Sequence, residues 1–265
     1  KKPTPTRKTI LITGATGFLG KTLVSLLSDY PNEFNIQTLV RDKEKAKEMM
    51  GGRKNVDYFD YRDFEHGILQ LPSIDTLIHC AFGRMMKSDR EIAESLKLTS
   101  KILTAAAQHH VPQVINISSQ RVYDVTKPIA YHEDHPVSPN TVYAQGKYAS
   151  ELMMNNLSTI NPQTRYTSLR MATLCGGQPG MQPEELIARF VKRALQKEPL
   201  HITGGTQTFE KLDVRDAARA ILALLRTPSD TWKPLYNVGS GTPVSIMDIA
   251  NRTVELAAIY NGCFF

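Results

Sequence analysis

The feature that most restricts the fold of this chain is a glycine-rich turn at residues 13–20, TGATGFLG. An apolar, β-branched run at 9–13 precedes it and an amphipathic stretch at 18–29 follows it, which predicts strand, turn and helix in direct succession. Glycines permit such a tight turn and let the backbone approach a diphosphate closely, while the helix N-terminus attracts its charge. The turn therefore predicts a dinucleotide site, with contacts from Gly14, Thr16, Gly17, Phe18, Leu19 and Gly20.

Short apolar runs alternate with amphipathic stretches over the first 170 residues or so, which is typical of a parallel sheet with helices on both faces. The predicted strands are 9–13, 36–40, 56–59, 76–79, 113–117, 166–170 and 235–238. The predicted helices are 18–29, 42–50, 89–109, 142–157, 184–196, 214–226 and 246–260. We therefore predict an α/β fold with a Rossmann-type doubly wound parallel sheet.

The texture of the sequence changes at residue 175, where glycine, proline and irregular turns become frequent. We expect residues 1–174 to form an NAD(P)-binding Rossmann domain. Residues 175–265 are then mainly a small C-terminal substrate-binding lobe, with segments near 210–240 returning to the first domain. The chain stops where such a lobe would normally continue.

Composition excludes several classes of protein. The chain has 265 residues, a net charge of +6 and 41% hydrophobic residues, and no apolar run approaches the roughly 20 residues of a membrane span. Lysine and arginine are scattered, so we expect a small-molecule substrate and no nucleic-acid or membrane partner. The basic N-terminus lacks a secretory apolar core, which predicts a cytoplasmic protein.

No metal site is expected. The three cysteines have neither disulfide-framework nor metal-ligand spacing. Two histidines and two carboxylates gather at 132–135, but they lie in a proline-bearing loop without a third cluster of ligands.

Cofactor preference depends on the end of the second predicted strand, where Val40 is followed by Arg41, Asp42 and Lys43. An acidic residue at this place binds the ribose hydroxyls of NAD, whereas an arginine pairs with the 2′-phosphate of NADP. Arg41, aided by Lys43, favours NADP over NAD, although Asp42 serves NAD if the strand ends one residue later. Asp60, which ends the third strand, is either a partner for the adenine or an ordinary turn residue.

Tyr143 and Lys147 lie four residues apart, so they share one face of a predicted helix. An ammonium near a phenol favours the phenolate, which lets the tyrosine transfer a proton closer to neutral pH. Lys147 is also placed to bond the nicotinamide ribose. Beside the glycine turn, this pair indicates an oxidoreductase site.

Taken in order, these and further motifs resemble the extended short-chain dehydrogenase/reductase family, also called the NAD-dependent epimerase/dehydratase family. The matching segments are the glycine turn, 74–81 (IDTLIHCA), 117–123 (ISSQRVY), Tyr143 with Lys147, Arg170, 214–216 (VRD) and 236–240 (YNVGS). The resemblance implies hydride transfer at a carbinol or keto carbon, with Ser119 polarising the oxygen, Tyr143 moving the proton and Lys147 tuning it. It places Ala81 beside the cofactor, and Ser119, Gln120, Arg121 and Met85 beside the substrate.

Three departures from the family pattern bear on the substrate. Gln120 and Arg121 stand where the dehydratases have an Asp-Glu pair, which argues against a sugar 4,6-dehydratase because loss of water needs an extra acid and base. Phe209 stands where nucleotide-sugar enzymes often have a diphosphate-binding arginine, and Ser95 replaces a usual asparagine. The expected function is epimerisation or reduction of a nucleotide-linked sugar. Two alternatives are an NADP-dependent carbonyl reductase for a non-sugar ketone or aldehyde, and a non-catalytic dinucleotide sensor.

A homodimer is a further possibility, because helices 89–109 and 142–157 resemble those that pair across a dimer in this family. Their apolar faces equally suit their own sheet.

Substituting Arg41 by alanine tests the cofactor preference. We expect affinity for NADPH to fall far more than affinity for NADH, by about tenfold or more, since a charge-assisted hydrogen bond contributes roughly 1.5–3 kcal/mol. Fluorescence titration measures both constants, and equal losses for the two cofactors would contradict a role at the 2′-phosphate.

Overall fold

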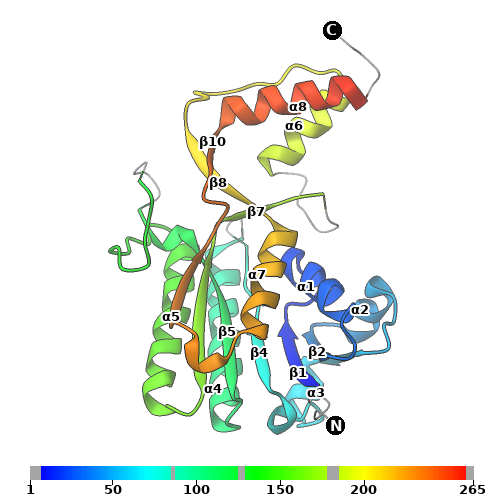
Figure 1. The fold of residues 1–265 in the computed structure, drawn as a ribbon, viewed down its shortest axis with the longest axis vertical. Coiled ribbons are helices and arrows are strands. Elements are labelled where there is room, and N and C mark those ends of the chain that lie inside the picture. Colours follow the sequence, from blue (N-terminus) through cyan, green and yellow to red (C-terminus); the bar gives the residue numbers. More distant parts are fainter. Residues whose placement is uncertain (1–6, 85–86, 125–128, 178–184, 261–265) are drawn as a thin grey trace.

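The computed structural model describes residues 7–84, 87–124, 129–177 and 185–260 (Figure 1). Its centre is a seven-stranded sheet in the order β3-β2-β1-β4-β5-β6-β9, and all the pairings are parallel. The strands are β1 (Lys8–Thr13), β2 (Phe34–Val40), β3 (Val56–Asp60), β4 (Thr76–His79), β5 (Gln113–Ser119), β6 (Arg165–Met171) and β9 (Leu235–Val238). The predicted doubly wound α/β fold is confirmed.

Helices cover both faces of this sheet (Figure 1). On one face α1 (Phe18–Ser28) packs against α7 (Val214–Arg226), and on the other α4 (Asp89–Gln108) packs against α5 (Val142–Ile160). Shorter elements near the ends of the strands are α2 (Lys43–Met50), α3 (Tyr61–Glu65), η1 (Leu71–Ser73), η2 (Gln120–Val122) and η3 (Ser229–Thr231).

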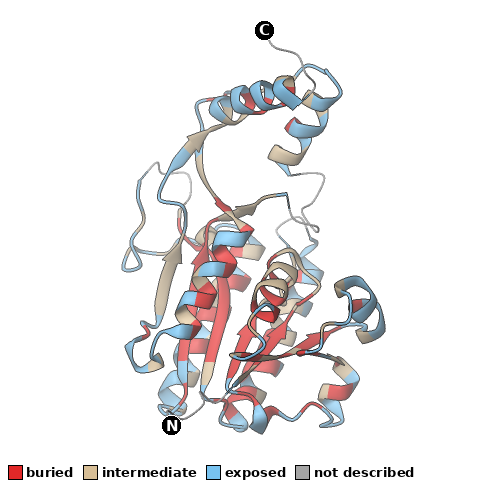
Figure 2. Ribbon diagram, turned by 45° about the vertical axis from the view of Figure 1, so that its right-hand side comes forward, coloured by how far each residue is buried: buried red, intermediate tan, exposed pale blue. Residues whose placement is uncertain are grey.

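The core follows from the two-residue period of the strands. In β1, Ile10 and Ile12 join the cluster under α1 and α7, whereas Leu11 between them joins the cluster under α4. Ile78 and Leu77 divide in the same way in β4. Because both faces are covered, the central strands β1, β4 and β5 are buried over most of their length, as Figure 2 shows in red, and buried residues do not alternate with exposed ones.

A smaller layer lies beyond one end of the large sheet (Figure 1). It holds a three-stranded sheet in the order β10-β8-β7 and two helices that pack together: β7 (Thr173–Cys175), β8 (Thr208–Asp213), β10 (Pro243–Ser245), α6 (Leu186–Leu195) and α8 (Ile246–Tyr260). The three small strands were not predicted, because strands of three to six residues with partly exposed side chains leave little periodicity. Between β8 and β10 the chain returns to the large sheet as β9, beside β6.

Several element boundaries differ from the prediction for local reasons. Helix 42–50 starts one residue later because the Asp42 side chain caps it by accepting from the Lys45 N–H at 3.0 Å. Helix 184–196 is shorter, with Glu185 at its N-cap, and helix 142–157 continues to Ile160. The five-residue helix α3 was missed. Within the described residues, no helix has the length and apolar character that a membrane span requires.

Substituting Gly20 by alanine tests the close packing of the glycine turn. An added Cβ would meet the Gly14 carbonyl oxygen and lie 2.8 Å from the Ala15 Cα, both of them backbone atoms that a side-chain rotation does not relieve. We expect destabilisation of about 1–3 kcal/mol, and a melting temperature lower by about 2–4 °C for each kcal/mol.

The matched control is Gly177→Ala, because a Cβ at Gly177 meets nothing within 4 Å. Thermal unfolding of the two variants should separate them. An unchanged melting temperature for Gly20→Ala would show that the turn is looser than described.

Candidate active site

The glycine turn lies at the point where the strand order of the large sheet changes direction, between β1 and β4. In doubly wound sheets, ligands bind in the crevice at the carboxyl ends of strands at this point. Gly14 has a φ of 67°, and a Cβ there would lie 2.7 Å from the Ala81 nitrogen. The backbone of the turn thus lies directly against the end of β4, which only glycine at this position permits.

Helix α1 begins without any compensation for its positive end. Its N-cap is Gly17, which supplies no side-chain cap, and its first turn holds no acidic residue. By contrast α2, α4, α5 and α7 each have a side-chain cap: Asp42, Ser88, Thr141 and Asp213. The free N–H groups and the helix dipole at α1 therefore fit an anion such as a dinucleotide diphosphate.

The predicted contacts of the glycine turn divide by exposure. Thr16, Gly17 and Phe18 are partly exposed at the turn. Leu19 and Gly20 are buried, and the Leu19 side chain belongs to the core cluster. Leu19 therefore contributes chiefly to the seating of α1 on the sheet.

The residues predicted to select the cofactor follow β2, which ends at Val40. Arg41 is exposed. Burial raises the pKa of Tyr61, and the charge of Arg41 offsets part of that rise. The Lys43 ammonium donates to both carboxylate oxygens of Asp63, at 2.8 and 2.9 Å. Lys43 is thus already ion-paired, and Arg41 is the basic group at this place that remains exposed.

Asp60 has a structural role that its sequence position left open. Its Oδ1 accepts from the N–H groups of Arg62 and Asp63, at 2.9 and 3.1 Å, and caps α3. These hydrogen bonds and the Arg62 guanidinium hold the pKa of Asp60 below its usual range. A contact with the adenine stays a prediction.

The structure brings together the predicted catalytic groups of β5 and α5. Ser119 ends β5 and is buried, and its hydroxyl oxygen accepts from the Arg121 N–H at 3.2 Å. Burial raises the pKa of Tyr143, while a hydrogen bond with Ser119 and the charge of Arg121 act in the opposite direction. The phenol of Tyr143 therefore lies beside Ser119 and within the field of Arg121.

Lys147 lies one turn further along α5 and points into the protein. Its buried ammonium donates to the Ile117 carbonyl oxygen at 2.7 Å and lies 4.2 Å from the centre of the Phe82 ring. Burial lowers the pKa of Lys147 to about 8. The sequence predicted that this ammonium lowers the pKa of Tyr143, but the pKa of Tyr143 is raised, and Ser119 and Arg121 supply the opposing influence. Burial is the largest influence on the pKa of Tyr143, and the Lys147 ammonium is engaged by the Ile117 carbonyl oxygen.

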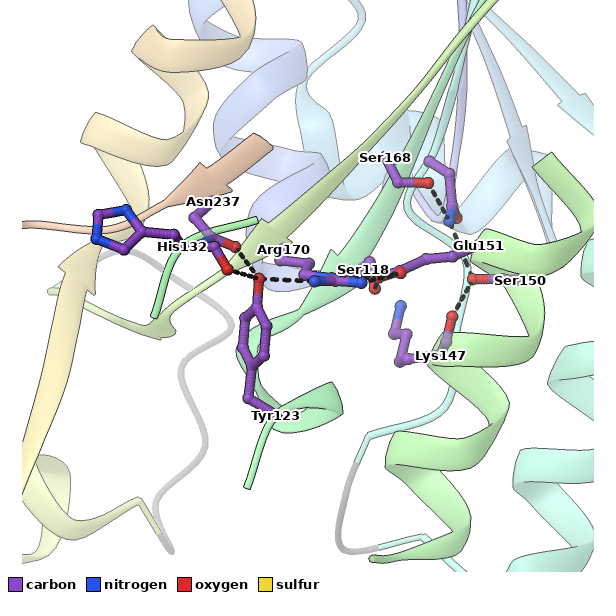
Figure 3. A network of polar contacts seen from close by, with 10 residues as sticks. Ser118, Tyr123, His132, Lys147, Ser150, Glu151, Ser168, Arg170 and Asn237 are labelled. Atoms are coloured by element: carbon purple, nitrogen blue, oxygen red, sulfur yellow. Dashed lines mark hydrogen bonds and ion pairs between the residues drawn. The ribbon is translucent and has the colours of Figure 1, made fainter. Parts of the chain in front are cut away.

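A buried ion pair joins β6 to α5, the helix that carries Tyr143 and Lys147 (Figure 3). The Arg170 guanidinium on β6 donates to the Glu151 carboxylate on α5, at 2.7 Å from Nη2 and 3.0 Å from Nε, and both side chains are 5% exposed. The Ser118 hydroxyl also donates to Glu151. Since Ser118 precedes Ser119 and Glu151 lies one turn beyond Lys147, the pair fixes β5, β6 and α5 relative to one another.

The same network extends to β9 through Tyr123 (Figure 3). The Tyr123 hydroxyl accepts from Arg170 Nη1 at 2.6 Å and lies 2.9 Å from Asn237 Oδ1. The Asn237 backbone N–H in turn donates to Glu133 at 2.8 Å. Sequence analysis missed this network, although Arg170 and the 236–240 segment were among the motifs of the resemblance.

A second buried chain of hydrogen bonds ties β1 to β4 and α4 through His79. The Thr13 hydroxyl oxygen accepts from the Ala81 N–H at 3.2 Å and lies 2.8 Å from His79 Nδ1. His79 Nε2 lies 2.9 Å from the Thr99 hydroxyl, which donates to the Ser95 carbonyl oxygen at 2.8 Å. Burial lowers the pKa of His79 to about 3, so the ring stays neutral.

Ser95, which replaces the usual asparagine, positions the loop after β4. Its hydroxyl donates to the Glu91 carbonyl oxygen at 2.7 Å and accepts from the Gly83 N–H at 3.0 Å. Ser95 therefore holds the backbone beyond Ala81, while a direct part in proton transfer is not visible in these contacts.

Two of the predicted substrate contacts, Gln120 and Arg121, directly follow Ser119 and are partly exposed. The Gln120 amide donates to the Thr173 hydroxyl at 3.1 Å, which links η2 to β7, and Arg121 is partly exposed. Met85 lies outside the described residues.

Comparisons with known proteins identify the family of the chain. The model of the NAD dependent epimerase/dehydratase family matches residues 10–239. The dTDP-glucose 4,6-dehydratase of Streptomyces niveus is 27% identical over 264 residues, covering 93% of this chain and 76% of the relative. The dTDP-4-dehydro-6-deoxy-D-allose reductase of Streptomyces bikiniensis is 28% identical over 267 residues, covering 94% and 81%.

Solved structures share the fold. The UDP-glucuronic acid 4-epimerase of Bacillus cereus, solved with NAD and UDP-4-deoxy-4-fluoro-glucuronic acid, superposes with a TM-score of 0.81. The two sequences are 23% identical, and the superposition covers 96% of this chain and 83% of that one.

The neutral, buried His79 predicts a pH dependence of stability. Its pKa is about 3 in the folded chain and 6.5 in the unfolded chain, so between these values the unfolded chain binds the extra proton. Stability should therefore fall as pH drops below 6.5, with this group contributing up to about 1.4 kcal/mol per pH unit.

Urea unfolding between pH 7.5 and about pH 5 measures this slope. His79→Gln, which keeps one donor and one acceptor, should make the slope shallower by about the amount stated. The exposed His109 at the end of α4 offers a matched control, His109→Gln, which should keep the slope of the unsubstituted chain. Identical slopes for all three chains would contradict a neutral His79.

Proposed function

Because the chain belongs to the NAD dependent epimerase/dehydratase family, we propose that it epimerises or reduces a nucleotide-linked sugar with NAD(P) as cofactor. The observation that carries the proposal is the placement of Ser119 and Tyr143 together at the carboxyl edge of the sheet, with Lys147 one turn away on α5. The N-terminus of α1, which has no side-chain cap and can bind an anion, lies at the same edge. The two curated relatives act, by their names, on dTDP-linked sugars.

The residues present fit a dinucleotide. Gly14, Gly17 and the first turn of α1 would hold the diphosphate, and Ala81 lies against the same turn. When bound, the nicotinamide supplies the hydride chemistry at the reacting carbon. The part left to the protein is position, electrostatics and proton transfer.

Within the general preference for NAD(P), we favour NADP. β2 ends at Val40, so Asp42 does not occupy the last strand position, and its carboxylate is engaged as the cap of α2. Arg41 is exposed and makes no hydrogen bond or ion pair within the described residues, which leaves its guanidinium available for a 2′-phosphate. The B. cereus structure contains NAD, so the Arg41 substitution decides between the two.

The raised pKa of Tyr143 keeps its phenol protonated at neutral pH, which suits donation of a proton to a keto oxygen. The Ser119 hydroxyl, beside that phenol, orients the same oxygen. Lys147, with a pKa of about 8, is mostly charged at pH 7 and adds positive potential below the reacting groups. In the opposite direction Tyr143 takes the proton back.

Dehydration is disfavoured, although a curated relative is a dTDP-glucose 4,6-dehydratase. Removal of water needs an acid and a base in addition to the tyrosine. An amide and a guanidinium, those of Gln120 and Arg121, follow Ser119, and the Gln120 amide is bonded to Thr173. Neither group serves as a general base at neutral pH.

One observation favours the second candidate, an NADP-dependent carbonyl reductase for a non-sugar ketone or aldehyde. Phe209 occupies the position of the usual diphosphate-binding arginine, and its ring lies 4.9 Å from the Lys211 ammonium. An apolar ring cannot donate a hydrogen bond to a diphosphate, which favours a substrate without one. This second candidate holds only if no other cation takes over the role of the arginine.

The predicted homodimer also stays a proposal. α4 and α5 pack side by side on one face of the sheet. On α5, Val142 and Leu152 are 40% and 49% exposed, which gives a second copy apolar side chains to cover.

Substituting Tyr143 by phenylalanine tests the proposed chemistry. We expect turnover to fall by about 10²–10⁴-fold, because the proton donor is lost, while cofactor affinity is retained. The matched control is Tyr148→Phe on the same helix, which should leave turnover unchanged. Full activity of Tyr143→Phe would contradict the assignment.

The substrate for this assay comes from a thermal-shift screen of nucleotide sugars and simple ketones with cofactor present. A ligand that binds the folded chain raises its melting temperature. Stabilisation by nucleoside diphosphate sugars supports the first candidate, and stabilisation by simple ketones alone supports the second.

A further inference from the structure

Lys211 of the small lobe is connected to the candidate catalytic residue Ser119 through one strand pairing and one hydrogen bond. Lys211 on β8 lies directly opposite Thr173 in the β7–β8 pairing. The Thr173 hydroxyl accepts from the Gln120 amide at 3.1 Å, and Gln120 is the residue after Ser119. Lys211 is therefore separated from Ser119 by one strand pairing and one hydrogen bond.

Arg121 brings a second positive charge to the same place. Its backbone N–H donates to the Ser119 hydroxyl oxygen at 3.2 Å, which places Arg121 at the candidate site. Its charge also acts on the pKa of both Tyr143 and Lys211. Arg121 and Lys211 come from different layers of the molecule, one from η2 and one from β8. They converge only because the two layers fold against each other.

Within the described part of the chain, neither Arg121 nor Lys211 is held in an ion pair. Among the residues that the structure describes, no carboxylate forms an ion pair with Arg121 or Lys211, and neither side chain makes a hydrogen bond. Asp213, two residues beyond Lys211, is already bound by Arg215 at 2.7 Å. The charge of Glu185 raises the pKa of Lys211 more strongly than that of Arg121 lowers it, but Glu185 forms no ion pair with Lys211. The Lys211 ammonium lies 4.9 Å from the centre of the Phe209 ring.

Two like charges in a partly buried place repel each other, and the repulsion is stronger there than in water. An anion between them removes that repulsion and gains charge-assisted hydrogen bonds from both. Because Arg121 also acts on Tyr143, such an anion would lie next to the oxygen that Tyr143 protonates. A diphosphate on the far side of a sugar ring is more distant from that oxygen than a carboxylate on the ring itself.

We propose that Arg121 and Lys211 form an anion-binding pair for a carboxylate of the substrate, adjacent to the reacting carbon. The preferred substrate is then an acidic, uronic-acid type of nucleotide sugar. On such a ring the carboxylate is attached next to a carbon that bears a secondary hydroxyl, so the pair holds the carboxylate while Ser119 and Tyr143 hold the oxygen. This inference rests on the proposed function.

The experiment compares binding of glucuronic acid and glucose, each linked to UDP and to dTDP, to the chain saturated with cofactor. Isothermal titration of the unsubstituted chain should give at least about tenfold tighter binding of the acidic sugar. Lys211→Met and Arg121→Met, which keep the length of the side chain but remove its charge, should each reduce that preference by roughly tenfold. Binding of the neutral sugar should change little.

Two further variants keep the result interpretable. Arg121→Lys retains the charge and should keep most of the preference, which a purely structural role of the guanidinium would not predict. Lys192→Met removes an exposed lysine from α6 of the same lobe and should have no effect on either sugar. Retained cofactor affinity shows that each variant is folded.

The outcomes separate the inference from the proposed function. Equal losses for acidic and neutral sugars would overturn the inference and assign the pair to the diphosphate. An unchanged preference in Lys211→Met would also overturn it. Failure of all four nucleotide sugars to bind the unsubstituted chain would overturn the inference. The proposed function is refuted only if no nucleotide sugar in the thermal-shift screen stabilises the chain.

Discussion

The ion pair between Glu151 and Arg170 is the interaction on which the candidate site depends. Both groups are buried, and loss of one partner from such a pair typically costs about 3–5 kcal/mol, because it leaves an uncompensated charge. The pair joins α5 to β6, and through Ser118 it reaches the end of β5. The serine and the tyrosine of the site lie on elements that this single contact aligns.

The two lobes contribute different kinds of chemistry to the site. The large sheet supplies buried groups whose ionisation is controlled by burial, such as Lys147 and the neutral His79. The small lobe supplies partly exposed groups, such as Lys211, that no ion pair within the described residues holds. Groups of the first kind suit chemistry that is common to a family, while groups of the second kind adapt it to a substrate.

Much of the fold could be predicted because its signals are local. The apolar runs of β1 and β4 and the glycine turn specify strand, turn and helix without help from distant residues, and the 76–79 strand and 214–226 helix have the predicted ends. The cap formed by Asp60 and the direction of the Lys147 ammonium could not be predicted, because each depends on what the folded chain brings near. The strands of the small lobe are too short and too exposed to carry a periodic signal. Likewise, the charge of Arg121 acts on Lys211, 90 positions further along the chain, and no spacing rule connects the two residues.

The path of the chain also has a consequence for biosynthesis. β9, the last strand of the large sheet, begins at Leu235, after β7, α6 and β8 of the small lobe have been made. A nascent chain that has emerged only as far as residue 234 presents β6 as an unpaired edge, with backbone groups open to other strands. Asn237, which completes the hydrogen bonds of Tyr123, arrives with that same strand. We therefore expect the larger layer to become resistant to aggregation and proteolysis on the ribosome only when β9 has paired with β6. The first elements of the small lobe are then synthesised while the large sheet still lacks its last strand.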